Sequence, residues 1–236
     1  MNAAQQKDTP MAIFSTLVGS FAGAGLAFVS NRYADHVERK RANLAAGNMA
    51  ISILSRQYGD FVIFRANLQA EATAKNKYPD WLQFSPSFLS FSEWLVIDMK
   101  SLTFLLQYGE HDLFAKLLDV QARYDDLRRL MAINNDACVA RDDMIMKAGL
   151  ADADPFADQH RFEAAVDVTL KAKLTGLNTA LRQRAKNELV NYQTTGQMLW
   201  DLMLSSYQVT EIMTFTAMGA QKELAKEPWK LDENQP

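Results

Sequence analysis

The sequence predicts an all-α protein, in which a single N-terminal transmembrane helix continues into an antiparallel bundle of long helices. Residues 11–30 contain no charged side chain. Glycine and proline are scarce, at 10 and 6 of 236 residues, which favours helix over irregular structure. Apolar residues also recur at heptad spacing through three long segments that lack proline.

Residues 11–30 are predicted to cross a membrane once. Twenty helical residues, at a rise of ~1.5 Å each, cover a hydrocarbon core of ~30 Å. A signal peptide fits less well, because residues 1–10 carry one lysine offset by one aspartate and no clear cleavage site follows. A buried core helix is disfavoured because every face of the segment is uncharged.

The basic residues beside this segment predict its orientation. Lys7 is the one basic residue before it, whereas four basic residues follow it: Arg32, Arg39, Lys40 and Arg41. The positive-inside rule then makes residues 1–10 an extracytoplasmic tail and residues 31–227 a cytoplasmic helical bundle. We expect the four basic residues to lie at lipid headgroups, at about 1 kcal/mol each.

One face of the predicted span carries small residues four apart: Ser15, Gly19, Gly23 and Ala27. Small side chains let two helix backbones approach closely, so this stripe predicts association of two spans. The alternative is a lone span in which glycine is merely tolerated.

Residues 31–77 are predicted to continue as one helix, reaching roughly 70 Å if it is straight. Two rows of residues seven apart form a heptad seam. The first row is Leu44, Ile51 and Tyr58, and the second is Gly47, Leu54, Phe61 and Leu68.

Residues 78–97 form a connector, because Pro79 and Pro86 interrupt helix. Its large rings are Trp81, Phe84, Phe88, Phe91 and Trp94. Aromatic residues dominate binding hot spots, so this connector is the candidate contact surface for a protein partner. The alternative is that the rings fold back and cap the bundle. Asp98 then begins a short helix that ends near Gly109.

Residues 110–147 show the clearest pattern in the chain. An unbroken 4-3 spacing joins Leu113, Leu117, Val120, Tyr124, Leu127, Met131, Asn134 and Cys138. This spacing predicts a helix with a coiled-coil-like core face. Asn134 is a candidate register-setting residue, as buried amides are in coiled coils, unless the face has ended there. Cys138 is expected to be an inert core thiol.

Residues 148–159 are predicted to form a turn, and residues 160–225 one or two helices with candidate bends at Gly176 and Gly196. Their apolar face includes Leu170, Leu174, Leu177, Leu181, Leu189, Tyr192, Gly196, Leu199 and Met203. Residues 228–236 are expected to be a flexible tail. Three long segments then suggest an up-down-up arrangement, with the aromatic connector at the end far from the membrane.

Composition and motifs exclude more functions than they suggest. The net charge of −3 argues against non-specific nucleic-acid binding. No phosphate loop, nucleophile elbow or metal-ligand motif is present, so we expect neither an enzyme nor a bound cofactor. Residues 152–163 match a calcium loop only in part, because Phe156 and Ala157 replace a ligand and the glycine. They are expected to form an acidic helix entry that binds no metal.

The basic segment SNRYADHVERKR, together with IDMKSLTFLL and LLDVQARYDDL, resembles uncharacterised bacterial inner-membrane proteins that have one N-terminal span and a helical cytoplasmic domain. This resemblance implies a place in the bacterial plasma membrane. It implies no activity and no site residues.

These observations predict a non-catalytic, membrane-tethered scaffold that acts through self-association, as a homo-oligomer, or through a cytoplasmic protein partner. Its other partner is membrane lipid. The alternative is a membrane-acting effector, toxin-like or channel-like, whose helical domain controls association of the spans.

Overall fold

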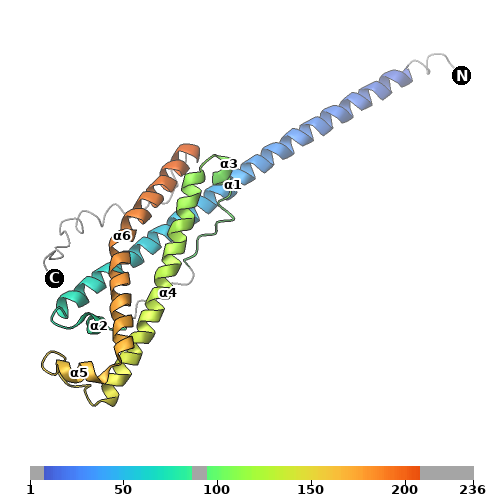
Figure 1. The fold of residues 1–236 in the computed structure, drawn as a ribbon. Helices are drawn as coiled ribbons and strands as arrows, with labels where there is room; N and C mark the ends of the chain where they lie inside the picture. The colour runs from blue at the N-terminus through green and yellow to red at the C-terminus, as the bar shows by residue number, and fades with distance from the viewer. Residues whose placement is uncertain (1–7, 87–94, 208–236) are drawn as a thin grey trace. The chain divides into compact units, whose positions relative to one another are not determined.

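The computed structural model describes residues 8–86 and 95–207, and in the first helix it describes side chains from Phe14 onward, Ser15 excepted. Within these ranges the chain is helical and contains no strand, which confirms the all-α prediction. The helices are α1 (Asp8–Ala74), α2 (Asp80–Gln83), α3 (Phe104–Gln107), α4 (His111–Lys147), α5 (Gln159–Ala165) and α6 (Val168–Tyr207) (Figure 1).

The chain divides into two compact units, residues 1–46 and residues 47–236. Helix α1 runs without interruption for 67 residues and contributes to both units, as the continuous helix after the apolar segment predicted. Its residues from Gly47 onward belong to the second unit, where they pack with α4 and α6. That second unit is a helical bundle.

The predicted core face of α4 is confirmed. All eight residues of the 4-3 spacing are buried. On α6 the predicted positions from Leu189 to Met203 are also buried, although Leu170 and Leu177 are only partly covered. On α1, both predicted rows are buried from Gly47 to Leu68, and Leu44 is half-buried.

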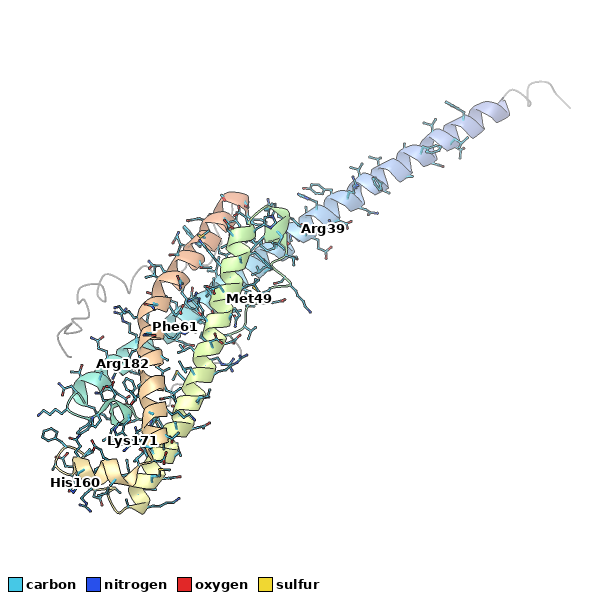
Figure 2. The ribbon with its side chains drawn as sticks, in the orientation of Figure 1. Arg39, Met49, Phe61, His160, Lys171 and Arg182 are labelled. Atoms are coloured by element: carbon cyan, nitrogen blue, oxygen red, sulfur yellow. The ribbon has the colours of Figure 1, made fainter. Side chains whose placement is uncertain are left out.

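Aromatic rings join the three long helices at the centre of the bundle. The ring of Phe61 on α1 lies 4.8 Å from that of Tyr192 on α6 and 6.3 Å from that of Tyr124 on α4 (Figure 2 labels Phe61). The Tyr124 hydroxyl donates to Asp60 Oδ2 at 2.5 Å, and the Tyr192 hydroxyl donates to the Val120 carbonyl at 2.8 Å. Each buried hydroxyl therefore has a partner, and burial raises the pKa of Tyr192.

The directions of the helices differ from the predicted up-down-up order. From α1 to α4, Gln57 meets Gln121 and Asp60 meets Tyr124, so residue numbers rise together and the two helices run parallel. From α1 to α6 the numbers run oppositely. Phe61 meets Tyr192, whereas a Cβ on Gly47 would overlap the Met203 side chain. Helix α6 is therefore antiparallel to both, and α4 does not return along α1 as expected.

The connector explains this difference, because its two described ends, before residue 87 and after residue 94, lie at different levels of the bundle. Phe84 lies beside Arg141, near the C-terminal end of α4. Farther along the connector, the Leu95 carbonyl accepts from Gln57 Nε2 at 2.7 Å, and the Ile97 amide donates to Gln121 Oε1 at 3.0 Å. The chain has thus returned to the middle of the bundle before α4 begins.

The turn at residues 148–159 consequently lies at the same end as the C-terminus of α1. Leu150 belongs to a buried cluster with Trp81 and Phe162. Gly149, with φ of +69°, ends α4 in the left-handed conformation that favours glycine. The up-down-up order would instead have put this turn at the opposite end of the bundle from the C-terminus of α1, so that expectation is wrong.

Two helix boundaries also differ from the predictions. Asp98 opens a turn, with its Oδ1 accepting from the Lys100 amide at 3.0 Å, but helix begins only at Phe104. After α5 the chain breaks at Val166 and Asp167, whereas the predicted bends at Gly176 and Gly196 lie inside continuous helix. Asp167 fixes the break, because its Oδ1 accepts from the Thr169 and Leu170 amides and caps α6.

Candidate functional site

The N-terminal part of α1 exposes apolar side chains on every side. Every described side chain from Phe14 to His36 is exposed, and Phe21 reaches 75%. The large apolar members are Phe14, Leu17, Val18, Phe21, Leu26, Phe28 and Val29. Among the described residues of this unit, none covers these apolar side chains.

The described residues of the small-residue stripe on this helix make no close packing contact with other described residues of their unit. Gly19, Gly23 and Ala27 are exposed, and a Cβ added to either glycine would meet nothing within 4 Å. The Ser15 side chain lies outside the described part of the chain. The stripe is thus available for another helix, and its predicted role in span association stays a prediction.

The four basic residues after the apolar segment are exposed, as headgroup contacts require: Arg32, Arg39, Lys40 and Arg41. The Arg32 guanidinium lies 5.2 Å from the centroid of the Phe28 ring, which is a cation–π distance. Figure 2 labels Arg39 on α1.

Among the described residues, no helix is long and apolar enough to cross a membrane. Residues 11–13 and Ser15, which belong to the predicted span of residues 11–30, have side chains outside the described set.

The structure corrects part of the predicted aromatic contact surface. Trp81 and Phe84 are 7% and 1% exposed, so both rings belong to the interior of the bundle. Trp81 packs in one cluster with Cys138 and Leu174, because α2 turns its apolar side towards α4 and α6. The remaining rings of the predicted surface, Phe88, Phe91 and Trp94, lie outside the described residues.

A buried arginine on α4 hydrogen-bonds to the start of the connector, at Trp81 and Phe84. Arg141 is 3% exposed, and its Nη1 donates to the carbonyl of Trp81 at 3.1 Å and to that of Phe84 at 2.7 Å. Its Nη2 lies 2.7 Å from Asp142 Oδ1, so the charge is also paired. Sequence reasoning missed Arg141, although the 4-3 spacing continues from Cys138 through Arg141 to Ile145.

Helix α6 holds the other side of α2. Asn178 Nδ2 donates to the Asp80 carbonyl at 2.6 Å. Arg182 pairs with the Asp80 carboxylate at 3.4 Å, donates to Gln83 Oε1, and has its guanidinium 5.0 Å from the Phe84 ring centroid (Figure 2 labels Arg182). Cations from two helices therefore converge on α2, and these contacts hold α2 against α4 and α6.

Asn134 and Cys138, the last two predicted core positions of α4, are both buried. Asn134 Nδ2 donates to Cys138 Sγ at 3.7 Å, and its Oδ1 is buried without a hydrogen-bond partner in the described structure. Burial raises the pKa of the Cys138 thiol, which favours its protonated form. Asn134 thus faces the core of its own bundle, so any effect on register is exerted within one chain.

A cavity of about 470 Å³ opens between α1, α4 and the end of α2. Its apolar wall includes Phe64, Leu68, Phe84, Met131 and Leu181. Its polar wall includes Asn67, Glu71, Ser85 and Asn135. It has the size of a small-molecule site. It also borders Pro86, the last described residue before residues 87–94, so its full lining is not described.

Buried polar groups in the middle of the bundle serve the fold. The Glu188 carboxylate, on α6, accepts from Arg123 at 3.0 Å, from Arg184 at 3.2 Å and from Asn191 at 3.3 Å. Gln57 Nε2 donates to Gln121 Oε1 at 3.0 Å. Gln57 Nε2 and Gln121 Oε1 thus hydrogen-bond to each other and to the connector backbone, whereas Gln57 Oε1 is buried without a hydrogen-bond partner among the described residues.

The acidic stretch of residues 152–163 uses its carboxylates for local turns. Asp154 Oδ1 accepts from the Phe156 amide at 2.9 Å, and Asp158 pairs with Arg161 at 3.3 Å. Glu163 accepts from Gln159 at 2.8 Å. In the described part of the chain, no three His, Cys, Asp or Glu side chains are grouped as metal ligands. Figure 2 labels His160 beside this turn.

No known protein family, curated protein or solved structure matches this chain.

Proposed function

We propose that this chain is a non-catalytic, membrane-tethered helical scaffold. Residues 11–30 anchor it in a bacterial plasma membrane, and the bundle of residues 47–207 acts in the cytoplasm through self-association or a protein partner. The supporting observation is the uncharged N-terminal helix whose large apolar side chains are all exposed. Burial in a bilayer removes that apolar surface from water at ~25 cal/mol per Å².

Two further observations support the proposed orientation and role. Four exposed basic residues follow the apolar segment, where anionic headgroups would neutralise them. In the bundle, the buried charges of Arg141 and Glu188 are held by backbone carbonyls or other side chains, which is typical of a rigid platform. Anchoring such a platform raises its local concentration, so a modest interface suffices.

Membrane fractionation tests the anchor. The full chain should float with membranes and resist extraction by alkaline carbonate. Replacing Phe21 and Leu26 together by Arg should release it, because arginine near the middle of a span costs about 2.5–3.5 kcal/mol. The matched control is arginine at Leu118 and Ile133, two exposed apolar positions on α4, which should leave the protein in the membrane.

A reporter fused to the C-terminus tests the orientation. Alkaline phosphatase at this position should be inactive, because the enzyme needs the oxidising periplasm. Active phosphatase would contradict the cytoplasmic placement, and carbonate release of the unaltered chain would contradict the anchor. Loss of membrane potential on expression would instead support the effector alternative.

A further inference from the structure

The cavity between α1, α4 and the end of α2 has an unsatisfied buried polar atom at its wall. Asn134, on α4, lines the cavity and is 4% exposed. The Cys138 thiol donates its one proton to the Phe84 carbonyl at 3.6 Å, so it accepts from Asn134 Nδ2 at 3.7 Å. Asn134 Oδ1 is the opposite end of this amide, and it has no hydrogen-bond partner among the described residues. Because an unpaired buried oxygen is costly, this atom is suited to accept from a ligand.

One charged side chain, Glu71 on α1, lies in the described wall of the cavity. It is half-buried, and its carboxylate has no ion pair or hydrogen bond within residues 8–86 and 95–207. Lys75, one turn further on, is not in that wall, and its ammonium donates instead to Ser85 Oγ at 2.5 Å. Burial is the main cause of the raised pKa of the Cys138 thiol, and the Glu71 charge adds to it. The carboxylate is therefore within electrostatic reach of the pair formed by Cys138 and Asn134.

The apolar wall is suited to an aromatic ring. Phe64, Leu68, Met131 and Leu181 come from three helices, and each is at most 7% exposed. A methionine sulfur makes favourable contacts with aromatic rings and adapts to their shape. The volume of about 470 Å³ lies within the range of small-molecule sites.

We propose that this cavity binds a small aromatic molecule that carries one protonated amine. The ammonium donates to the Glu71 carboxylate and to Asn134 Oδ1, and the ring packs against Phe64 and Met131. An ammonium has three donors and no acceptor, which matches a wall that offers two acceptors. An alcohol has one donor, and an anionic ligand would meet the like charge of Glu71. Such binding is separate from the scaffold role proposed above and does not depend on the membrane anchor.

Isothermal titration calorimetry of the full chain with tryptamine is the first test. Tryptamine joins an indole ring to one ammonium group. The matched probes are tryptophol, in which a hydroxyl replaces the amine, and indoleacetate, which is an anion. All three are titrated in the same non-ionic detergent. Tryptamine should bind about tenfold more tightly than tryptophol, because hydrogen bonds between charged groups are the stronger ones, and indoleacetate should not bind.

Two substitutions test the contacts of the amine. Glu71→Gln should weaken tryptamine binding about tenfold and leave tryptophol binding nearly unchanged. Asn134→Leu has a similar volume and removes the acceptor, so it should weaken tryptamine binding about fivefold. The matched control is Glu163→Gln, which neutralises an exposed carboxylate on α5 outside the described wall and should change neither affinity.

The place of binding is tested at the rim of the cavity. Ala70 is exposed on α1 and lines the cavity, so Ala70→Phe should obstruct it and abolish tryptamine binding. The matched control is Ala66→Phe, which changes an exposed alanine one turn earlier and should bind tryptamine normally. In NMR spectra of methyl-labelled methionine, tryptamine should shift the Met131 signal. The signal of Met203, which lies beside Gly47, should stay in place.

Three results would overturn the proposal. One is no tryptamine binding by the unaltered chain, which is the outcome expected if residues 87–94 fill the cavity. Another is binding that Ala70→Phe leaves unchanged, which would place the ligand in the detergent or elsewhere on the chain. The third is equal affinity for tryptamine and tryptophol, or equal tryptamine affinity in Glu71→Gln and the unaltered chain. Circular dichroism of every variant would show that a loss of binding is not a loss of fold.

Discussion

Replacing Arg141 by leucine removes the charged donor that holds the start of the connector against α4. Leucine fills part of the same volume, but the carbonyls of Trp81 and Phe84 lose a partner at 3.1 Å and 2.7 Å. Both donations come from a side chain that is 3% exposed, so water cannot simply replace it.

The magnitude follows from the chemistry of these contacts. A hydrogen bond to a charged group contributes roughly 1.5–3 kcal/mol to stability. Losing two of them, less the desolvation cost that the variant no longer has to meet, gives an expected loss of about 3–5 kcal/mol. For a domain of this size, each kcal/mol shifts the melting temperature by ~2–4 °C, so the expected loss is about 6–20 °C.

Urea and thermal unfolding of the full chain, followed by circular dichroism at 222 nm, would measure this loss. Arg129→Leu is the matched control, because Arg129 lies on the exposed side of the same helix, and it should change stability by less than ~0.5 kcal/mol. If Arg141→Leu also changed stability by less than about 1 kcal/mol, the carbonyl contacts would not hold the connector.

Three other predictions follow from buried groups. Leu117→Ala and Leu127→Ala should each cost about 2–5 kcal/mol, whereas Asp119→Ala, on the exposed side, should be nearly neutral in the same urea titration. Burial raises the pKa of the Asp60 carboxyl above its usual value of ~4, and the hydrogen bond from Tyr124 partly offsets this rise. The folded protein should therefore lose stability as the pH rises from ~4 through the raised pKa. Asp60→Asn should flatten the stability curve in that pH range. Cys138 should react with a thiol reagent only in denaturant, and rapid labelling of the native chain would contradict its burial.

The long helices and their buried faces could be predicted because heptad spacing is a local property. A residue three or four positions from its neighbour lies on the same helix face whatever the rest of the fold does. Every α4 position that the spacing selected, from Leu113 to Cys138, is buried. The direction of α4 is a different kind of property, because it depends on where the preceding connector ends.

That end point is set by contacts between distant residues. Gln57 and Gln121 are 64 positions apart, and their side chains meet the backbone at Leu95 and Ile97. Residues 78–97 show no periodicity that would reveal a return along the bundle, and Pro79 and Pro86 alone indicate only that helix stops. A local pattern therefore predicted the elements, and long-range hydrogen bonds determined their order in space.

Arg141 shows why a core position can be missed even when the spacing is regular. The 4-3 pattern reaches it directly from Cys138, but a charged side chain at that position indicates solvent in most helices. The burial becomes favourable only because two backbone carbonyls of the connector lie within reach of the guanidinium. The burial of Arg141 thus depends on the position of the connector, and the position of the connector depends on Arg141, so neither can be predicted from its own segment alone.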